Sequence, residues 1–186
     1  MEGLSDNEVM LKVKNGDLRK MDLLFRRYRD SLFAFIFRMT NRREASEDMV
    51  QNVFYRIIRS RHTFTGHGEF KTWMFHLARN VIKDHYKMET RNGNHVDISS
   101  YDEKLEGGQL AGSEIEKKQE LLLLQSALQK LNPEDREIIV LSRFHDLKYY
   151  EIARIMDSTV GAVKTRMHRA INQLKVMLLK SGTNEM

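Results

Sequence analysis

Apolar residues recur along most of the chain at steps of three and four residues, the spacing of one face of an α-helix. The first set lies at 24–39 and the second at 50–58. A turn-rich break at 63–68 separates them from a third set, on a helix predicted at about 70–87. No segment shows the sustained alternation of a strand. The pattern predicts a first helical domain over residues 1–95.

The apolar period disappears after residue 90, where turn residues and acids replace it. We expect a flexible acidic linker at 96–118, which carries 6 Asp and Glu against 3 Lys and Arg. Helical periodicity then resumes, and Asn132 can cap a further helix that has Pro133 at its first position. A second, smaller helical domain is expected at 119–186. The predicted fold class is therefore all-α, with two small helical domains joined by the linker.

Residues 149–170 have the spacing of two short helices around a tight turn. Asp157 stands at the turn, since Asp tolerates the left-handed backbone conformation, and Thr159 can cap the second helix. From residue 158 to 184 there is no Asp or Glu, although there are five Lys and Arg. An acid-free helix after such a turn is typical of one that enters the major groove of DNA. The candidate contacts to base edges and phosphates are Lys164, Thr165, Arg166, His168 and Arg169.

The helix predicted at about 70–87 carries cations and aromatic rings beside its apolar stripe. This mixture suits single-stranded nucleic acid, because bases stack on rings while Lys and Arg follow the phosphates. Aromatic residues at helical spacing also commonly belong to a hydrophobic core. Composition alone leaves both interpretations open.

The net charge is +5, with 18 Lys and Arg against 12 Asp and Glu over residues 1–95 and 10 against 8 over residues 119–186. Basic surface favours nucleic acid as the first partner and anionic membrane as the second, while a basic protein without such a partner is the plainer alternative. The chain has no cysteine, which excludes disulfides and thiolate zinc sites. We expect a soluble, cytoplasmic protein, since no signal peptide or run of about 18 apolar residues is present.

Two motifs of the first domain are EDMVQNVF at 47–54 and FKTWMFHLARN at 70–80. The first is similar to the helix by which the extracytoplasmic-function (ECF) group of bacterial RNA polymerase sigma factors, within the sigma-70 family, docks on the polymerase. Asp48, Gln51 and Phe54 carry that likeness. The second is similar to the same group's promoter-melting helix.

A third motif joins Glu151-Ile152-Ala153 to residues 160–166 and resembles the recognition helix of the same group. Ala162 stands where the group commonly has Thr, and Asp157 stands at its usual turn glycine. The three motifs occur in order over nearly the whole chain. The resemblance thus implies a region 2-like domain and a region 4-like helix-turn-helix domain.

The resemblance implies that the second domain reads the −35 promoter element and that the first domain opens the −10 element. Non-template bases would be captured by the loop at 63–68 and the helix after it. Phe75 stands where many members have Tyr, which keeps the ring and removes a hydroxyl. The candidate residues for recognition and melting at −10 are Phe64, Lys71, Trp73, Phe75, His76, Arg79, Asn80 and Lys83.

The implied partners are promoter DNA and core RNA polymerase, through its β′ clamp helices and β flap. An anti-sigma factor, membrane-anchored in many members, is a further partner by analogy. No catalytic site, metal or cofactor is implied. The acidic linker is most economically a solvated spacer, and its alternative is a polyanion mimic in the RNA path of the polymerase.

Three other functions are alternatives. A free-standing helix-turn-helix regulator would leave the two motifs of the first domain unexplained. A metal-dependent nuclease is disfavoured, because the 7 His are scattered and neither a His-Glu-x-x-His helix nor a carboxylate cluster accompanies them. A structural adaptor would not need an acid-free recognition helix. Binding to core RNA polymerase separates the sigma-factor hypothesis from all three.

Overall fold

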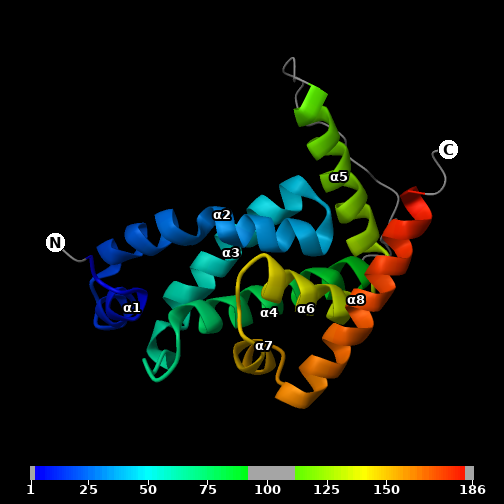
Figure 1. Ribbon diagram of the computed structural model, residues 1–186. Helices are drawn as coiled ribbons and strands as arrows, with labels where there is room; N and C mark the ends of the chain where they lie inside the picture. Colours follow the sequence, from blue (N-terminus) through cyan, green and yellow to red (C-terminus); the bar gives the residue numbers. More distant parts are fainter. Residues whose placement is uncertain (1–2, 92–111, 183–186) are drawn as a thin grey trace.

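The computed structural model describes residues 3–91 and 112–182, and every regular element in those ranges is helical (Figure 1). The all-α prediction is therefore confirmed. Residues 96–111 of the predicted linker lie outside the described ranges, so its flexibility stays a prediction. In chain order the elements are α1 (Asp6–Lys14), η1 (Leu18–Lys20), α2 (Met21–Thr40), α3 (Arg43–Arg59), η2 (Arg61–Thr63), α4 (Phe70–Arg91), α5 (Gly112–Gln129), α6 (Pro133–Arg143), α7 (Tyr149–Ile155) and α8 (Val160–Gly182).

Helices α2, α3 and α4 pack on one another and form the core of the first half. Their inward faces are the three apolar sets that the sequence predicts. Helix α2 ends at Thr40, and the residue that follows, Asn41, has a left-handed φ of 57°, a conformation that Asn tolerates. The buried side chains of these helices include Leu24, Leu32, Phe35, Ile36, Val53, Ile57, Met74, Ala78 and Val81.

Helix α1 was not expected from the apolar pattern. Its start is set by a capping box, in which the Ser5 hydroxyl accepts from the Glu8 N–H while the Glu8 carboxylate accepts from the Ser5 N–H. Val9, Met10 and Val13 are fully buried against the rest of the first half. The helix therefore forms part of the core despite its many charged residues.

Helix α6 of the second half begins at the cap that the sequence predicts, Asn132. Asn132 Oδ1 accepts from the Glu134 N–H at 3.0 Å, and Pro133 occupies the first turn of α6. The turn between α7 and α8 has the predicted geometry as well. Asp157 has a φ of 52°, and Thr159 Oγ1 accepts from the Ala162 N–H at 3.2 Å. The helix-turn-helix prediction is confirmed.

The two halves lie against each other, and their buried apolar side chains form one continuous cluster. Gln129 Nε2 donates to the Arg38 carbonyl at 2.8 Å, which joins the end of α5 to the end of α2. The Arg38 guanidinium lies 4.2 Å from the centre of the Phe144 ring. Arg136 is buried and donates to the carbonyls of Leu128 and Met39, one in each half. The predicted division into domains at 1–95 and 119–186 stays a prediction.

His145 lies in this contact between the halves. Its ring centre is 5.8 Å from that of Phe35 and 4.8 Å from that of Phe75, and its Nδ1 is 3.2 Å from Ser31 Oγ. The side chain is buried. Burial, reinforced by the nearby cation of Arg38, lowers the pKa of His145 to about 4. The imidazole is therefore neutral at physiological pH.

Acidification should destabilise the folded chain through His145. An unfolded His titrates near 6.5, so the unfolded chain takes up the proton first, and the free energy of unfolding falls as the pH drops from about 6.5 towards 4. The contribution is at most about 1.4 kcal/mol per pH unit. Urea unfolding between pH 7 and pH 5, compared with a His145→Gln variant, measures it. Equal pH dependence in both proteins would contradict the buried neutral state of His145.

Candidate functional site

Helix α8 carries all five candidate DNA-contacting residues, and their contact with DNA stays a prediction. Lys164, Thr165 and His168 are exposed, with Thr165 and His168 on the outer face of the helix and Lys164 on its shoulder. The opposite face is buried, with its apolar residues Val163, Met167 and Ala170 packed on α6 and α7. The N-terminal half of α8 therefore presents exposed polar side chains on one face and an apolar, packed face on the other.

The other two candidates on α8 are held by acids at the start of α6. Arg169 donates through Nε and Nη2 to the Asp135 carboxylate, with an Nη2–Oδ1 distance of 2.8 Å. The Asp135 side chain is 2% exposed, whereas that of Arg169 is 57% exposed. Arg166 pairs with Glu134. Two cations of the recognition helix are thus oriented by carboxylates rather than left free.

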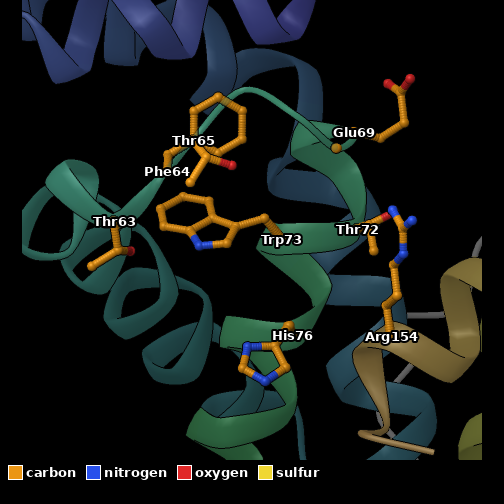
Figure 2. A pocket seen from close by; sticks show the side chains of 9 residues that line it. Thr63, Phe64, Thr65, Glu69, Thr72, Trp73, His76 and Arg154 are labelled. Carbon is orange, nitrogen blue, oxygen red and sulfur yellow. The ribbon is translucent and has the colours of Figure 1, made fainter.

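A cavity of about 230 Å³ lies between the loop after η2 and the start of α4. Figure 2 shows the Trp73 indole in the middle of the lining side chains, with the Phe64 ring beside it. These two ring centres are 5.4 Å apart, and Phe64 is 3% exposed. Polar groups from both walls complete the lining. The residues that line it include Thr63, Thr65, Glu69, Thr72, His76 and Arg154.

Helix α1 holds the loop that forms this cavity. The Asn7 side chain donates to the Gly68 carbonyl at 3.0 Å and accepts from the Phe70 N–H at 2.7 Å, which also caps α4. Lys14 Nζ donates to the Phe64 carbonyl at 2.6 Å. Gly66 has a φ of 77°, so the loop requires a residue that tolerates this conformation. An element that the sequence did not reveal therefore fixes the predicted capture loop.

Several predicted melting residues on α4 contact the second half of the chain. Arg79 Nε donates to Glu137 Oε2 at 3.1 Å, and both side chains are 7% exposed. Lys71 Nζ donates to the His145 carbonyl at 2.5 Å. Phe75 is fully buried. Arg79, a predicted DNA contact, is therefore buried at the junction of the two halves, where Glu137 of α6 pairs with it.

The remaining melting candidates stay accessible in part. His76 is half-buried, with Nε2 3.7 Å from Asp157 Oδ2, and Asn80 is half-buried too. Lys83 is exposed. The structure thus brings Phe64, Trp73 and His76 to one cavity and leaves Lys83 farther along the same helix.

Helix α3 carries the third candidate surface. Asp48 and Gln51 are exposed, whereas Phe54 is buried and its ring centre lies 4.8 Å from that of Phe25. Phe54 therefore supports the helix from inside. Tyr55 is 61% exposed and stands four residues after Gln51, on the same face. The sequence motif did not single out Tyr55, although its position four residues after Gln51 indicates that the two side chains lie on the same face of the helix.

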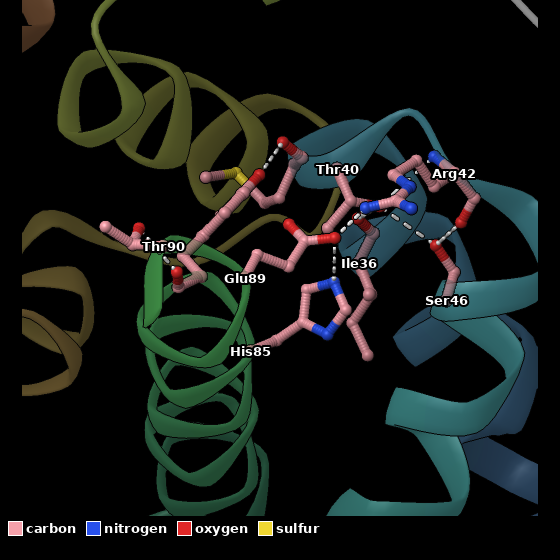
Figure 3. Close-up of polar contacts among 9 residues, drawn as sticks. Ile36, Thr40, Arg42, Ser46, His85, Glu89 and Thr90 are labelled. Atoms are coloured by element: carbon pink, nitrogen blue, oxygen red, sulfur yellow. Dashed lines mark hydrogen bonds and ion pairs between the residues drawn. The ribbon is translucent and has the colours of Figure 1, made fainter. Parts of the chain in front are cut away.

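A polar cluster anchors the start of α3 to the end of α4 (Figure 3). Arg42 pairs with the Glu89 carboxylate, and His85 Nε2 lies 3.4 Å from the same carboxylate. The fully buried Ser46 donates to the Arg42 carbonyl at 2.5 Å and contacts Thr40 Oγ1 at 3.0 Å. Burial, reinforced by Arg42, lowers the pKa of His85. This cluster fixes the orientation of the exposed face of α3.

Within residues 3–91 and 112–182, no group of three or more His, Asp or Glu is placed to hold a metal ion. No helix in the same ranges has the length and apolar character needed to cross a membrane.

Solved structures share this fold. CnrH, in complex with the cytosolic domain of CnrY, superposes with a TM-score of 0.71 at 22% identity, over 93% of this chain and 96% of that one. The sigma factor RpoE of Bartonella quintana, in complex with the anti-sigma factor NepR, gives a TM-score of 0.65 at 22% identity, over 84% of this chain and 95% of that one.

Family models and curated relatives agree with the fold. Residues 24–92 match sigma-70 region 2, and residues 121–174 match sigma-70 region 4. The RNA polymerase sigma-H factor of Pseudomonas aeruginosa is 28% identical over 172 residues, 89% of each chain. The ECF RNA polymerase sigma-E factor of Escherichia coli K12 is 31% identical over 177 residues, 91% of this chain and 92% of that one. This chain belongs to the ECF group of RNA polymerase sigma factors, the sigma-70 proteins that act in transcription initiation.

Proposed function

We propose that this sigma factor docks on core RNA polymerase through α3, reads the −35 element with α8 and opens the −10 element with the loop and helix around Trp73. The observation that carries this proposal is the cavity of about 230 Å³ beside the Trp73 and Phe64 rings. It lies at the N-terminal end of α4, and the exposed Lys83 farther along that helix can meet the phosphates of a single strand.

The cavity suits one unstacked base of the non-template strand. Extruding a base costs a few kcal/mol, and stacking on an aromatic ring returns about 1–3 kcal/mol per base. The hydroxyls of Thr63 and Thr65 and the imidazole of His76 supply polar groups for the edge of the base. Lys83, exposed farther along α4, is suited to a phosphate.

The proposed −35 contacts differ in whether the side chain is held by another residue and in which part of the DNA it suits. Thr165 and His168 are exposed on the outer face and suit base edges, whereas Lys164 on the shoulder suits a phosphate. Arg169 keeps Nη1 outside its hydrogen bonds with Asp135. That nitrogen can meet the duplex from a fixed orientation, which reduces the entropy lost on binding.

The polymerase-binding face would consist of Asp48 and Gln51, with Tyr55 added by the structure. We propose that this face of α3 binds the β′ clamp helices of core RNA polymerase and that the second half of the chain binds the β flap. An anti-sigma factor is a further proposed partner, supported by the solved relatives that were captured with CnrY and NepR. We infer that the chain acts by binding alone, without catalysis or cofactor. Its site of action would be the cytoplasm, where polymerase and promoter DNA meet.

The double substitution Asp48→Ala, Gln51→Ala should weaken binding to core RNA polymerase by tenfold or more, because both side chains are exposed on the proposed docking face. Size-exclusion co-elution and a fluorescence titration with core polymerase measure this. The matched control is Gln119→Ala, Glu120→Ala, which removes an exposed amide and an exposed carboxylate from α5. Equal affinity in both variants would refute the assignment of α3.

The substitution Trp73→Ala should impair opening of a duplex promoter by the holoenzyme, because the captured base loses its stacking surface, a loss of about 1–3 kcal/mol. Fluorescence of 2-aminopurine placed in the −10 element reports the opening. A promoter with a premelted −10 bubble should rescue most of the defect. His62→Ala, an exposed change beside the loop, serves as the control. Normal opening by the Trp73 variant would exclude the cavity as the capture site.

Substitutions on α8 should separate phosphate contacts from base contacts. Lys164→Ala should lower the slope of log affinity against log salt by about 1, whatever the −35 sequence. His168→Ala should cost about 1–3 kcal/mol on the preferred sequence and little on others. Holoenzyme binding to duplexes over a range of salt concentrations measures both effects. A reversed pattern would overturn the assigned orientation of α8.

A further inference from the structure

Helix α1 lies beside the loop that forms one wall of the cavity, residues 64–69 between η2 and α4 (Figure 1). Three side chains of α1, at steps of four and three residues, contact this loop or its junction with α4: Asn7, Leu11 and Lys14. The core positions of the same helix are Val9, Met10 and Val13. The residues that meet the loop are therefore distinct from those that hold the core together.

Both ends of the loop are hydrogen-bonded to α1. At the first residue, Lys14 Nζ donates to the Phe64 carbonyl at 2.6 Å. At the other end, the Asn7 side chain donates to the Gly68 carbonyl at 3.0 Å and accepts from the Phe70 N–H at 2.7 Å. The Lys14 bond has a charged donor, which makes it stronger than a bond between neutral groups. One short helix thus fixes where the loop begins and where it passes into α4.

The middle of the loop has weak support of its own. The His67 N–H donates to Thr65 Oγ1 at 3.4 Å, a long distance for a hydrogen bond, and both side chains are exposed. A Cβ placed on Gly66 would lie 3.5 Å from Leu11 Cδ2, so the Leu11 side chain packs on the loop backbone at that point. A loop with few internal contacts takes its shape from the element on which it packs.

Helix α1 is itself anchored on α2 without help from the loop. The Asp6 carboxylate accepts from Arg27 Nη1 at 2.6 Å and from the Tyr28 hydroxyl. Burial, reinforced by Asp6, raises the pKa of Tyr28, so its hydroxyl keeps the proton that it donates. The Tyr28 ring centre lies 5.5 Å from that of Phe70, the first residue of α4. The support of the loop is therefore tied to the helix that carries Trp73.

The wall of the cavity depends on the shape of this loop. Phe64, Thr65 and Gly68 line the cavity, and Figure 2 shows the Phe64 and Thr65 side chains above the Trp73 indole. Phe64 is 3% exposed, and its ring centre lies 5.4 Å from that of Trp73. The backbone carbonyl of the same Phe64 is the group that Lys14 holds. Displacement of the loop would therefore move one wall of the cavity relative to the indole.

We infer that Asn7 and Lys14 are positioning residues for base capture, which hold the loop so that the cavity beside Trp73 is formed before a base arrives. The inference rests on the proposed capture of a base in this cavity. Both residues act through backbone groups of the loop. A preformed cavity binds more tightly, because the apparent affinity is the intrinsic affinity multiplied by the fraction of molecules competent to bind.

The first test uses the free full-length chain, in which Trp73 is the one tryptophan and reports on the cavity without a label. Lys14→Met, which keeps an apolar stem, and Asn7→Ala should each raise acrylamide quenching of Trp73 by about twofold. The matched controls Lys12→Met and Asn15→Ala, both at exposed positions, should leave it unchanged. A merely structural role would lower the thermal unfolding midpoint without changing quenching of the folded protein, and that result would overturn the inference.

The second test uses the holoenzyme and a promoter that carries one abasic nucleotide, placed in turn at each non-template position of the −10 element. On the intact promoter, Lys14→Met should slow opening by about fivefold, with 2-aminopurine as the reporter. At the position where an abasic nucleotide slows the wild type most, the variant should open as fast as the wild type. No base is left there for the cavity to bind, so the two changes are not additive. A defect of equal size at every position would overturn the inference.

Failure of the proposed function would look different. If no abasic position slowed the wild type and Trp73→Ala opened promoters normally, base capture in the cavity would be wrong, and the inference would fall with it. If one abasic position slowed the wild type while Lys14→Met and Asn7→Ala opened the intact promoter at the wild-type rate, base capture would stand and the role of α1 would fall.

Discussion

Helix α4 is packed on two sides, and this constraint shapes both halves of the molecule. Met74, Ala78 and Val81 close the core of the first half, whereas Arg79 binds Glu137 of the second half. An α-helix has 3.6 residues per turn, so one helix can carry an apolar face and a polar face over the same few turns. In α4 the apolar face packs in the first half, and the polar face meets the second half. The cavity at its N-terminal end adds a third role. The fold therefore joins structural support and proposed DNA binding in one 22-residue element.

Carboxylates of the second half organise cations on both proposed DNA-binding helices. Asp135 is almost fully buried and holds Arg169, which stays more than half exposed. In contrast, Glu137 and Arg79 are buried together. The Asp135 carboxylate thus holds the Arg169 guanidinium where solvent can reach it, whereas the Arg79 guanidinium is buried with Glu137. The two pairs thus differ in the exposure of the cation, which stays accessible in Arg169 and not in Arg79.

Features set by local spacing were predictable from the sequence. The cap at Asn132, the left-handed turn at Asp157 and the cap at Thr159 each depend on residues within a few positions, and all three are present. Helix α1 was missed because its apolar face is short, although Ser5 and Glu8 carry the spacing of a capping box.

Contacts between distant segments could not be read from spacing. The burial of Arg79 and Phe75 depends on α6 and on His145, more than 55 residues away in the chain. The share of Arg154 in the cavity depends on the packing of α7 against α4. Tyr55 is an intermediate case, because helical spacing places it beside Gln51 while only the fold shows that it is exposed.

The most direct measurement is a structure of the holoenzyme, assembled from core RNA polymerase and this sigma factor, on a promoter with a melted −10 element. We expect a non-template base in the cavity beside Trp73 and Phe64. A structure in which the promoter is open while that cavity is empty would contradict the proposed function.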